Sequence, residues 1–167
     1  MQQWEPPDSH YLLAAAGWVE LRNYDEAKAE LSRIDSALSQ HPDALEIWWA
    51  IHAGEKHWAE ALETARLLIN RASDRASGWL YQAYALRRAA GGGLQAAWDA
   101  LLPALEKFPD EPIIPYNLSC YACQVGQLDQ ARKWFKLAVK IGGNDSINKL
   151  ALADPDLKPL WAEIRKG

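Results

Sequence analysis

Cys120 and Cys123 are the residues whose type and spacing most clearly suggest chemistry in this sequence. Two thiols at this spacing can form a redox pair or provide half of a zinc site. Reactive pairs usually lie at a helix N-terminus, where the helix dipole lowers the thiol pKa, but these two fall inside a predicted helix. No second cysteine pair exists, and the four histidines are scattered at positions 10, 41, 52 and 57. We expect two reduced thiols without metal. A thiol- or metal-responsive protein is kept as an alternative that thiol titration and metal analysis would test.

His52 and His57 flank Glu55 and form the second group of residues that suggests chemistry. Two histidines four residues apart on one helix can share a metal ion. These two are five residues apart and lie on either side of a predicted turn. We therefore expect no shared ion at this position.

A glycine-rich segment, Ala90-Gly91-Gly92-Gly93, is the third group. Glycine-rich loops can bind phosphate, but the lysine and hydroxyl residue of a phosphate-binding loop do not follow it, and no strand precedes it. We interpret it as a long turn. No serine is flanked by a glycine elbow, and no carboxylate pair stands out as an acid–base couple. The sequence thus predicts no catalytic residue, no cofactor and no metal, and hence no enzyme.

Four alanines at nearly constant intervals indicate the elements that carry these residues. Ala27, Ala61, Ala97 and Ala131 are separated by 34, 36 and 34 residues. Each begins an apolar run with steps of three and four, which places the run on one side of a helix. These runs reach Leu38, Ile69, Leu105 and Val139, and the helices expected before them span 11–22, 44–54, 77–89 and 114–125. Every unit is therefore a helix, a tight turn and a second helix.

Pro42 and Pro109 are expected to end second helices, and Gly126 is expected to end a first helix in a left-handed conformation. With these signals, the run from Asn117-Leu118 to Gly126-Gln127-Leu128-Asp129-Gln130-Ala131 resembles the tetratricopeptide repeat family, and the resemblance covers roughly residues 8 to 143. It implies an all-α superhelix, a tetratricopeptide-like solenoid of about four helical hairpins, in a single domain spanning 1–167. The repeats would lie at about 8–41, 42–74, 75–110 and 111–143, with a capping helix pair at 144–167.

The segment after Gly143 predicts the cap. Asp154-Pro155-Asp156 provides an N-cap, a proline at the first helical position and an acid in the first turn. Only one side of the helix that follows is apolar, as expected of an element that covers the exposed face of a last repeat. Its apolar residues, expected to dock on the second helix of the fourth unit near Phe135 and Val139, are Leu157, Leu160, Trp161 and Ile164.

The resemblance also implies a binding surface, because in this family the first helix of each repeat lines a concave groove. It implies an adaptor or scaffold that binds a peptide or protein segment there. A dedicated chaperone for a secreted or assembled bacterial protein is the alternative. The positions expected to line the groove are Leu12, Ala16, Glu46, Ala50, Leu80, Tyr84, Arg87, Arg88, Tyr116, Asn117, Cys120 and Cys123.

Composition limits the partners of the chain. A net charge of −4 over 167 residues, with charges of both signs well mixed, offers no basic stripe for nucleic acid. No apolar stretch reaches the length of a membrane span, and the first eight residues do not read as a secretory signal. We expect a cytoplasmic protein with a protein partner. Nine tryptophans against two phenylalanines make any exposed tryptophan of interest.

Overall fold

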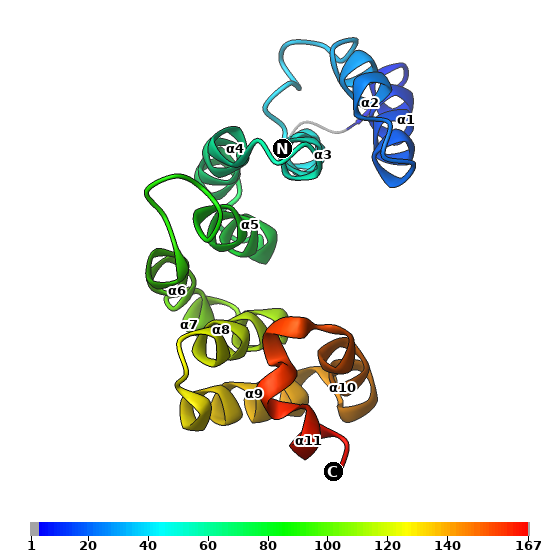
Figure 1. Cartoon of the computed structure of the whole chain (residues 1–167). Coiled ribbons are helices and arrows are strands. Elements are labelled where there is room, and N and C mark those ends of the chain that lie inside the picture. The colour runs from blue at the N-terminus through cyan, green and yellow to red at the C-terminus, as the bar shows by residue number, and fades with distance from the viewer. Residues whose placement is uncertain (1–3, 167) are drawn as a thin grey trace. The chain divides into compact units, whose positions relative to one another are not determined.

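The computed structural model describes residues 4–166, and every regular element in that range is a helix. Packing divides the chain into two compact units, Met1–Gly91 and Gly92–Gly167, which are described separately. The boundary falls in the glycine-rich turn, so the hairpin expected at 75–110 is divided between the units. The predicted all-α fold is confirmed (Figure 1). The single domain remains a prediction.

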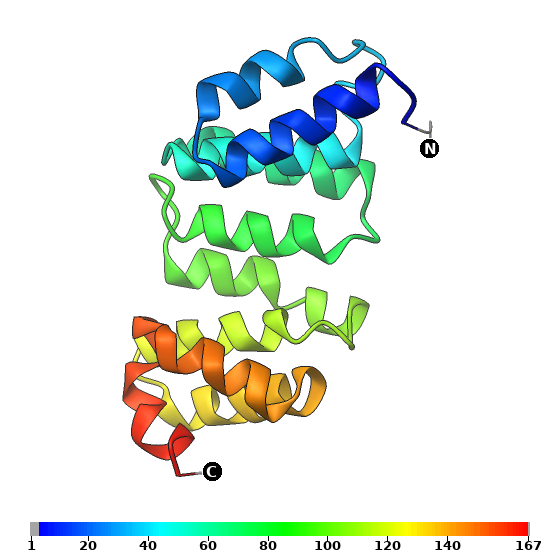
Figure 2. The ribbon, with the colours of Figure 1, turned by 90° about the vertical axis from the view of Figure 1, so that its right-hand side faces the viewer.

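The first unit contains α1 (Asp8–Glu20), α2 (Tyr24–Leu31), α3 (Pro42–Gly54), α4 (Trp58–Arg71) and α5 (Ala76–Leu86). α1 packs on α2, α3 packs on α4, and α4 packs on α5, as Figure 2 shows for consecutive helices of this unit. Ala27 and Ala61 are fully buried, as the spacing of the repeat alanines requires. Because alanine has no side chain beyond Cβ, the two helices of a hairpin approach closely at these positions.

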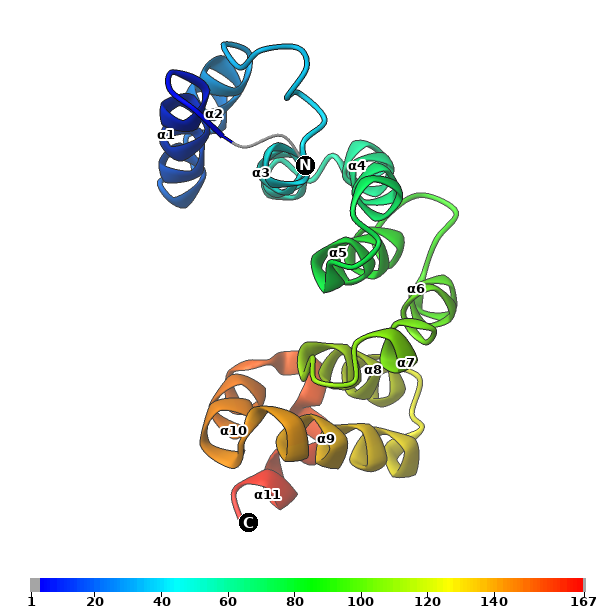
Figure 3. The same ribbon diagram turned by 180° about the vertical axis from the view of Figure 1, so that it is seen from behind.

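The second unit contains α6 (Leu94–Leu101), α7 (Ala104–Lys107), α8 (Ile113–Gln124), α9 (Leu128–Gly142), α10 (Asn144–Ala153), a 3-10 helix η1 (Pro155–Leu160) and α11 (Trp161–Ile164). α8 and α9 form its central hairpin, seen from behind in Figure 3. Ala131 is fully buried in that hairpin, and its carbonyl accepts a hydrogen bond of 2.9 Å from the Ser119 hydroxyl.

Three hairpin turns share one hydrogen-bond pattern. Arg22, Lys56 and Gly126 each adopt a left-handed conformation after α1, α3 and α8, with φ of 58°, 62° and 77°. The next residue donates to the carbonyl five positions earlier, for example His57 N–H to the His52 carbonyl at 2.8 Å. This is the Schellman motif, which satisfies carbonyls that a helix end leaves without partners. The prediction for Gly126 is confirmed, and the same turn forms twice without glycine.

Two second helices are shorter than their apolar runs predicted. α2 ends at Leu31, and Ile34 and Leu38 are buried from a segment of turns instead. The Asp8 carboxylate accepts a hydrogen bond of 2.9 Å from the backbone N–H of Asp35, which fixes the non-helical path. Pro42 therefore begins α3 and does not end α2. In the third run the helix stops at Leu101 and resumes after Pro103, since proline removes a helical donor.

The C-terminal cap forms at the predicted residues but packs mainly on another helix. The Asp154 carboxylate accepts the N–H of Asp156 at 2.9 Å, and Leu157, Leu160 and Ile164 are buried. η1 lies chiefly against α8, the first helix of the hairpin, with smaller contacts to α9 and α10. The expected docking on the second helix is thus only partly right: Leu160 and Ile164 share a pocket with Phe135 and Val139, where α9 contributes.

Candidate functional site

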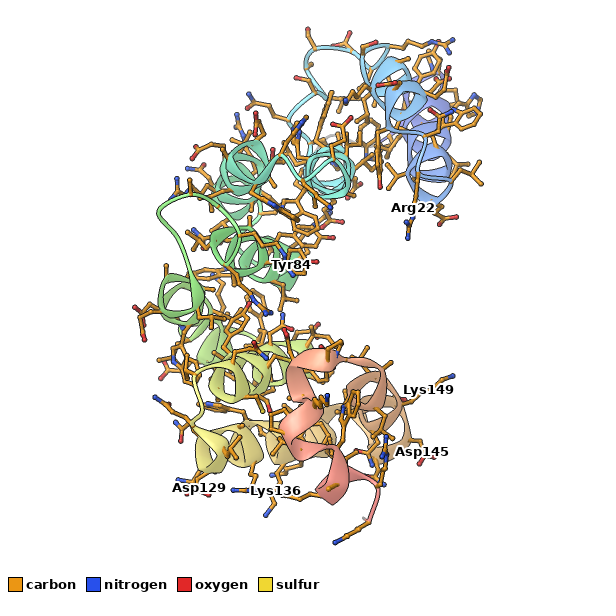
Figure 4. The ribbon with its side chains drawn as sticks, in the orientation of Figure 1. Arg22, Tyr84, Asp129, Lys136, Asp145 and Lys149 are labelled. Carbon is orange, nitrogen blue, oxygen red and sulfur yellow. The ribbon has the colours of Figure 1, made fainter. Side chains whose placement is uncertain are left out.

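A cluster of four aromatic rings and one arginine lies on α3, α4 and α5 of the first unit. We call it the Tyr84 surface, and it consists of Trp49, Trp58, Tyr81, Tyr84 and Arg88. The Trp49 and Tyr81 rings are stacked, with centroids 3.9 Å apart and planes 5° apart. Tyr84 meets Trp49 edge-on at 5.8 Å and is 39% exposed, and Figure 4 shows it on α5. The stack below thus holds an aromatic ring at the protein surface.

Arg88 adds a positive charge to this surface. Its guanidinium carbon lies 3.5 Å from the Tyr84 ring centroid and 5.4 Å from that of Trp58. It also donates a hydrogen bond of 3.0 Å to the Tyr84 carbonyl, so the side chain is held in place at the end of α5. Among the residues that the structure describes, no carboxylate forms an ion pair with Arg88. Its charge is therefore available to a ligand.

Glu46, predicted to line the groove, belongs to a polar network at the other end of α3 and α5. The Ser77 hydroxyl donates to Glu46 at 2.6 Å, and Arg75 lies 3.4 Å from it and 2.6 Å from Asp43. Burial opposes ionisation of Asp43, but hydrogen bonds from Arg75 and Trp4 outweigh burial and lower the pKa of its carboxyl. Arg75 thus neutralises charge on both acids, and the network ties α3 to α5.

The other predicted positions of the first unit are partly accessible. Leu12 and Ala16 on α1, Ala50 on α3 and Leu80 on α5 are half-buried. Arg87 is also half-buried and is the C-cap residue of α5, where its N–H donates to the Ala83 carbonyl at 3.1 Å.

The corresponding face of α8 is covered by the chain itself, which contradicts its assignment to an open groove. Tyr116, Cys120 and Cys123 are only 3%, 3% and 6% exposed. The Tyr116 hydroxyl donates to the Asp154 carboxylate at 3.0 Å, and the Cys120 thiol lies 3.6 Å from the same oxygen. The turn that begins η1 therefore occupies this face. Asn117 beside it is half-buried.

Both thiols are poor nucleophiles in this environment. Burial, together with the charges of Asp154 and Asp156, raises the pKa of Cys120 far above its ordinary value. The same causes raise the pKa of Cys123 to about 11. A thiol of this kind stays protonated near neutral pH, whereas redox and metal chemistry use the thiolate. The geometry therefore speaks against the thiol- or metal-responsive alternative at these two residues.

His52, Glu55 and His57 lie together, contrary to the expectation from their spacing. One ligand atom from each of the three lies within 4.8 Å of the others. The spacing did not indicate this proximity because it treated the turn as a spacer, whereas the Schellman motif brings side chains five positions apart close together. Burial lowers the pKa of His52, although the carboxylates of Glu60 and Glu55 act in the opposite direction.

Comparison with known proteins places these sites in a known fold. No protein-family profile and no curated protein match the sequence. Among solved structures, TTC0263, described as a thermophilic TPR protein of Thermus thermophilus, matches with a TM-score of 0.67 and 19% identity, over 95% of both chains. Two structures of MamA match with TM-scores of 0.66 and 0.64, each at 17% identity; they cover 95% and 91% of this chain and 88% and 90% of MamA. The chain has a tetratricopeptide-repeat fold.

Within this tetratricopeptide fold, three residues of the Tyr84 surface were not predicted as site residues: Trp49, Trp58 and Tyr81. The high tryptophan content, nine in 167 residues, drew attention to exposed tryptophans in general but did not single out these positions. None of the described helices is long and apolar enough to cross a membrane.

Proposed function

We propose that the chain is a protein-interaction module that binds a segment of a partner protein on the Tyr84 surface. The observation that carries the proposal is the guanidinium of Arg88, held 3.5 Å from the ring centroid of the exposed Tyr84 and paired with no carboxylate among the described residues. Tyrosine, tryptophan and arginine are the residues that most often dominate the energy of protein interfaces. Their low conformational freedom here reduces the entropy lost on binding.

The chemistry of the surface favours a segment that combines an apolar side chain with a carboxylate. Arg88 offers donors to an acid, and the Tyr84 and Trp58 rings offer apolar area beside it. Glu46, at the other end of α3, does not repel such an acid strongly, because Arg75 and Ser77 already pair with it.

The C-terminal cap supplies an internal example of the same chemistry. On α8 the Asp154 carboxylate accepts a hydrogen bond from the Tyr116 hydroxyl at 3.0 Å, while Leu157 close by is fully buried. An acidic and apolar segment of this chain thus binds the face of a first helix in the repeat. We infer that a partner segment of similar composition binds the Tyr84 surface of the first unit.

The test needs a ligand, which selection from a displayed random-peptide library on the whole chain would provide. Binding of a selected peptide is then measured by fluorescence anisotropy for the wild type, Tyr84→Ala and Arg88→Glu. Each substitution should weaken binding by about 2 kcal/mol or more, as expected for a residue that dominates an interface. Circular dichroism checks that both variants fold.

Arg33→Glu is the matched control. Arg33 also lies over a tyrosine, with its guanidinium carbon 4.0 Å from the Tyr11 ring centroid, and it is exposed. The substitution changes the charge by the same amount outside the Tyr84 surface, so peptide affinity should stay unchanged. Equal losses from Arg88→Glu and Arg33→Glu would reject this surface as the binding site. Partner capture from the native host with mass spectrometry would then separate an adaptor from a dedicated chaperone.

A further inference from the structure

The turn between α3 and α4 carries nitrogen and oxygen ligands in one place. We propose that His52, Glu55 and His57 bind one divalent transition-metal ion of the zinc class. One ligand atom from each lies within 4.8 Å of the others, and the Nδ1 of His57 is 3.5 Å from a carboxylate oxygen of Glu55. Ligand atoms of a tetrahedral zinc ion, at about 2.0–2.2 Å from the metal, are about 3.4 Å apart. The distance between His57 and Glu55 already matches this spacing.

The backbone of the turn explains why these side chains meet. Lys56 has a φ of 62°, its N–H donates to the Ala53 carbonyl at 3.1 Å, and the His57 N–H donates to the His52 carbonyl at 2.8 Å. In a Schellman motif the two residues joined by the longer hydrogen bond usually make an apolar contact, and here they are His52 and His57. The two other turns with this pattern bring together Trp18 with Asn23 and Ala122 with Gln127. Only the α3–α4 turn of these three therefore presents two imidazoles.

Two polar atoms of these side chains are buried without a hydrogen-bond partner among the described residues. They are Nδ1 of His52 and Oε2 of Glu55. The contact between Glu55 and His57 at 3.5 Å is an ion-pair distance and does not satisfy the carboxylate oxygen with a hydrogen bond. Burying such atoms unpaired is unfavourable, and a bound cation would satisfy both at once.

Neighbouring residues fix the orientation of these ligands. The Trp48 and His52 rings are stacked, with centroids 5.7 Å apart and planes 22° apart. The Nζ of Lys28 lies 2.5 Å from Oε1 of Glu55, and the other carboxylate oxygen, Oε2, lies 3.5 Å from Nδ1 of His57. Outer contacts of this kind hold metal ligands in position. Glu60 in the first turn of α4 acts electrostatically on His52 and adds a second negative charge near the site.

The donor set selects the class of ion. Two imidazole nitrogens and one carboxylate suit zinc and its transition-metal neighbours, whereas magnesium and calcium prefer oxygen ligands alone. Three protein ligands leave a fourth position for water. The cysteines are not needed, since the burial that protonates them also keeps them from acting as thiolate ligands.

The experiment titrates zinc chloride into the metal-free whole chain and follows binding by isothermal titration calorimetry. The expected result is one ion per chain and an upward shift of the thermal unfolding midpoint, because a ligand of the native state stabilises it. His57→Gln and His52→Gln should each weaken binding by at least the roughly 10–100-fold that follows loss of an outer contact. The side chain of His57 is 55% exposed and makes no capping hydrogen bond, so its substitution leaves the fold intact.

Two controls keep the test specific. His10→Gln removes an exposed histidine of α1, and Cys120→Ser with Cys123→Ser removes both thiols. Unchanged zinc affinity in both controls, together with loss in His57→Gln, supports the site. The proposal is overturned by zinc binding that survives His52→Gln and His57→Gln, by binding that disappears with the cysteines, or by the absence of saturable binding at one ion per chain.

Discussion

The face of α5 in the first unit and the face of α8 in the second unit each carry a tyrosine, and the two tyrosines differ in exposure. On α5, Tyr84 is 39% exposed and lies under the guanidinium of Arg88. On α8, Tyr116 is 3% exposed and donates its hydroxyl to Asp154. A tyrosine on the first helix of a repeat is thus exposed in one unit and part of the core in the other.

The position of a residue within its repeat therefore does not by itself determine whether the residue is exposed to a partner. The face of α8 is occupied because the chain returns after α10 and places Asp154 and Leu157 against it. Such a cap gives the terminal repeat of a solenoid a covered face. Within the first unit no closing segment of this kind covers the described part of α5, and the charge of Arg88 remains unpaired there.

The largest expected effect tests the covered face. Leu157 is fully buried under the cap, so Leu157→Ala should lower the free energy of unfolding by about 2–5 kcal/mol, through lost burial and a residual cavity. Tyr84→Ala on the open face should cost about 1 kcal/mol, since its ring is partly in water already. Urea denaturation of the two variants beside the wild type measures both. Equal losses would mean that the two faces do not differ in the way that their burial indicates.

Sequence reasoning succeeded where structure is local. The alanine spacing predicted the hairpins, and Ala27, Ala61 and Ala131 are fully buried on the second helices of those hairpins. It failed at Tyr116 and Cys120, because the residue that covers them, Asp154, lies more than thirty positions later in the chain. The periodicity of a helix does not indicate which of its faces a distant segment of the chain will cover.

The proximity of His52, Glu55 and His57 was not foreseen for a different reason. This proximity depends on the left-handed conformation of Lys56. Glycine is the usual residue in that conformation, so a lysine gave no sequence signal for the turn. The Gly126 turn was predicted correctly on that signal. A comparison of the two turns in register would have placed His52 and His57 at the positions that the motif brings together.

A smaller effect is expected from pH, and it belongs to the covered face alone. Burial and the charges of Asp156 and Asp154 raise the pKa of Cys123 to about 11, and the pKa of Cys120 is raised as well. In the unfolded chain a thiol loses its proton near pH 8.5, so above that pH the unfolded state binds fewer protons than the folded state. The stabilisation is complete below about pH 8.5 and is lost as the pH rises through the folded pKa.

The wild type should therefore lose more free energy of unfolding between pH 8 and pH 11 than the double variant Cys120→Ser with Cys123→Ser loses. Urea denaturation at a series of pH values measures the difference. Identical curves for the two proteins would show that the thiols ionise freely, and hence that the cap opens readily from α8.

The smallest expected effect compares two turns of the same type, one in each unit. Lys56 of the first unit and Gly126 of the second adopt φ of 62° and 77°, a region that costs a residue with a Cβ roughly 1–2 kcal/mol relative to glycine. Apart from Gly126 itself and its two chain neighbours, no residue places a heavy atom within 4 Å of where a Cβ on Gly126 would stand, so Gly126→Ala isolates the backbone cost. Gly126→Ala should destabilise the protein by about 1 kcal/mol. Lys56→Gly should stabilise it by about 0.5–1 kcal/mol, partly offset by the greater freedom of glycine in the unfolded chain.

Thermal unfolding of both variants tests the pair, and Asp110→Ala, an exposed substitution elsewhere, serves as control. Changes of the same sign in Lys56→Gly and Gly126→Ala would show that the two turns are not equivalent, and the contact between His52 and His57 would then need a cause other than the Schellman geometry.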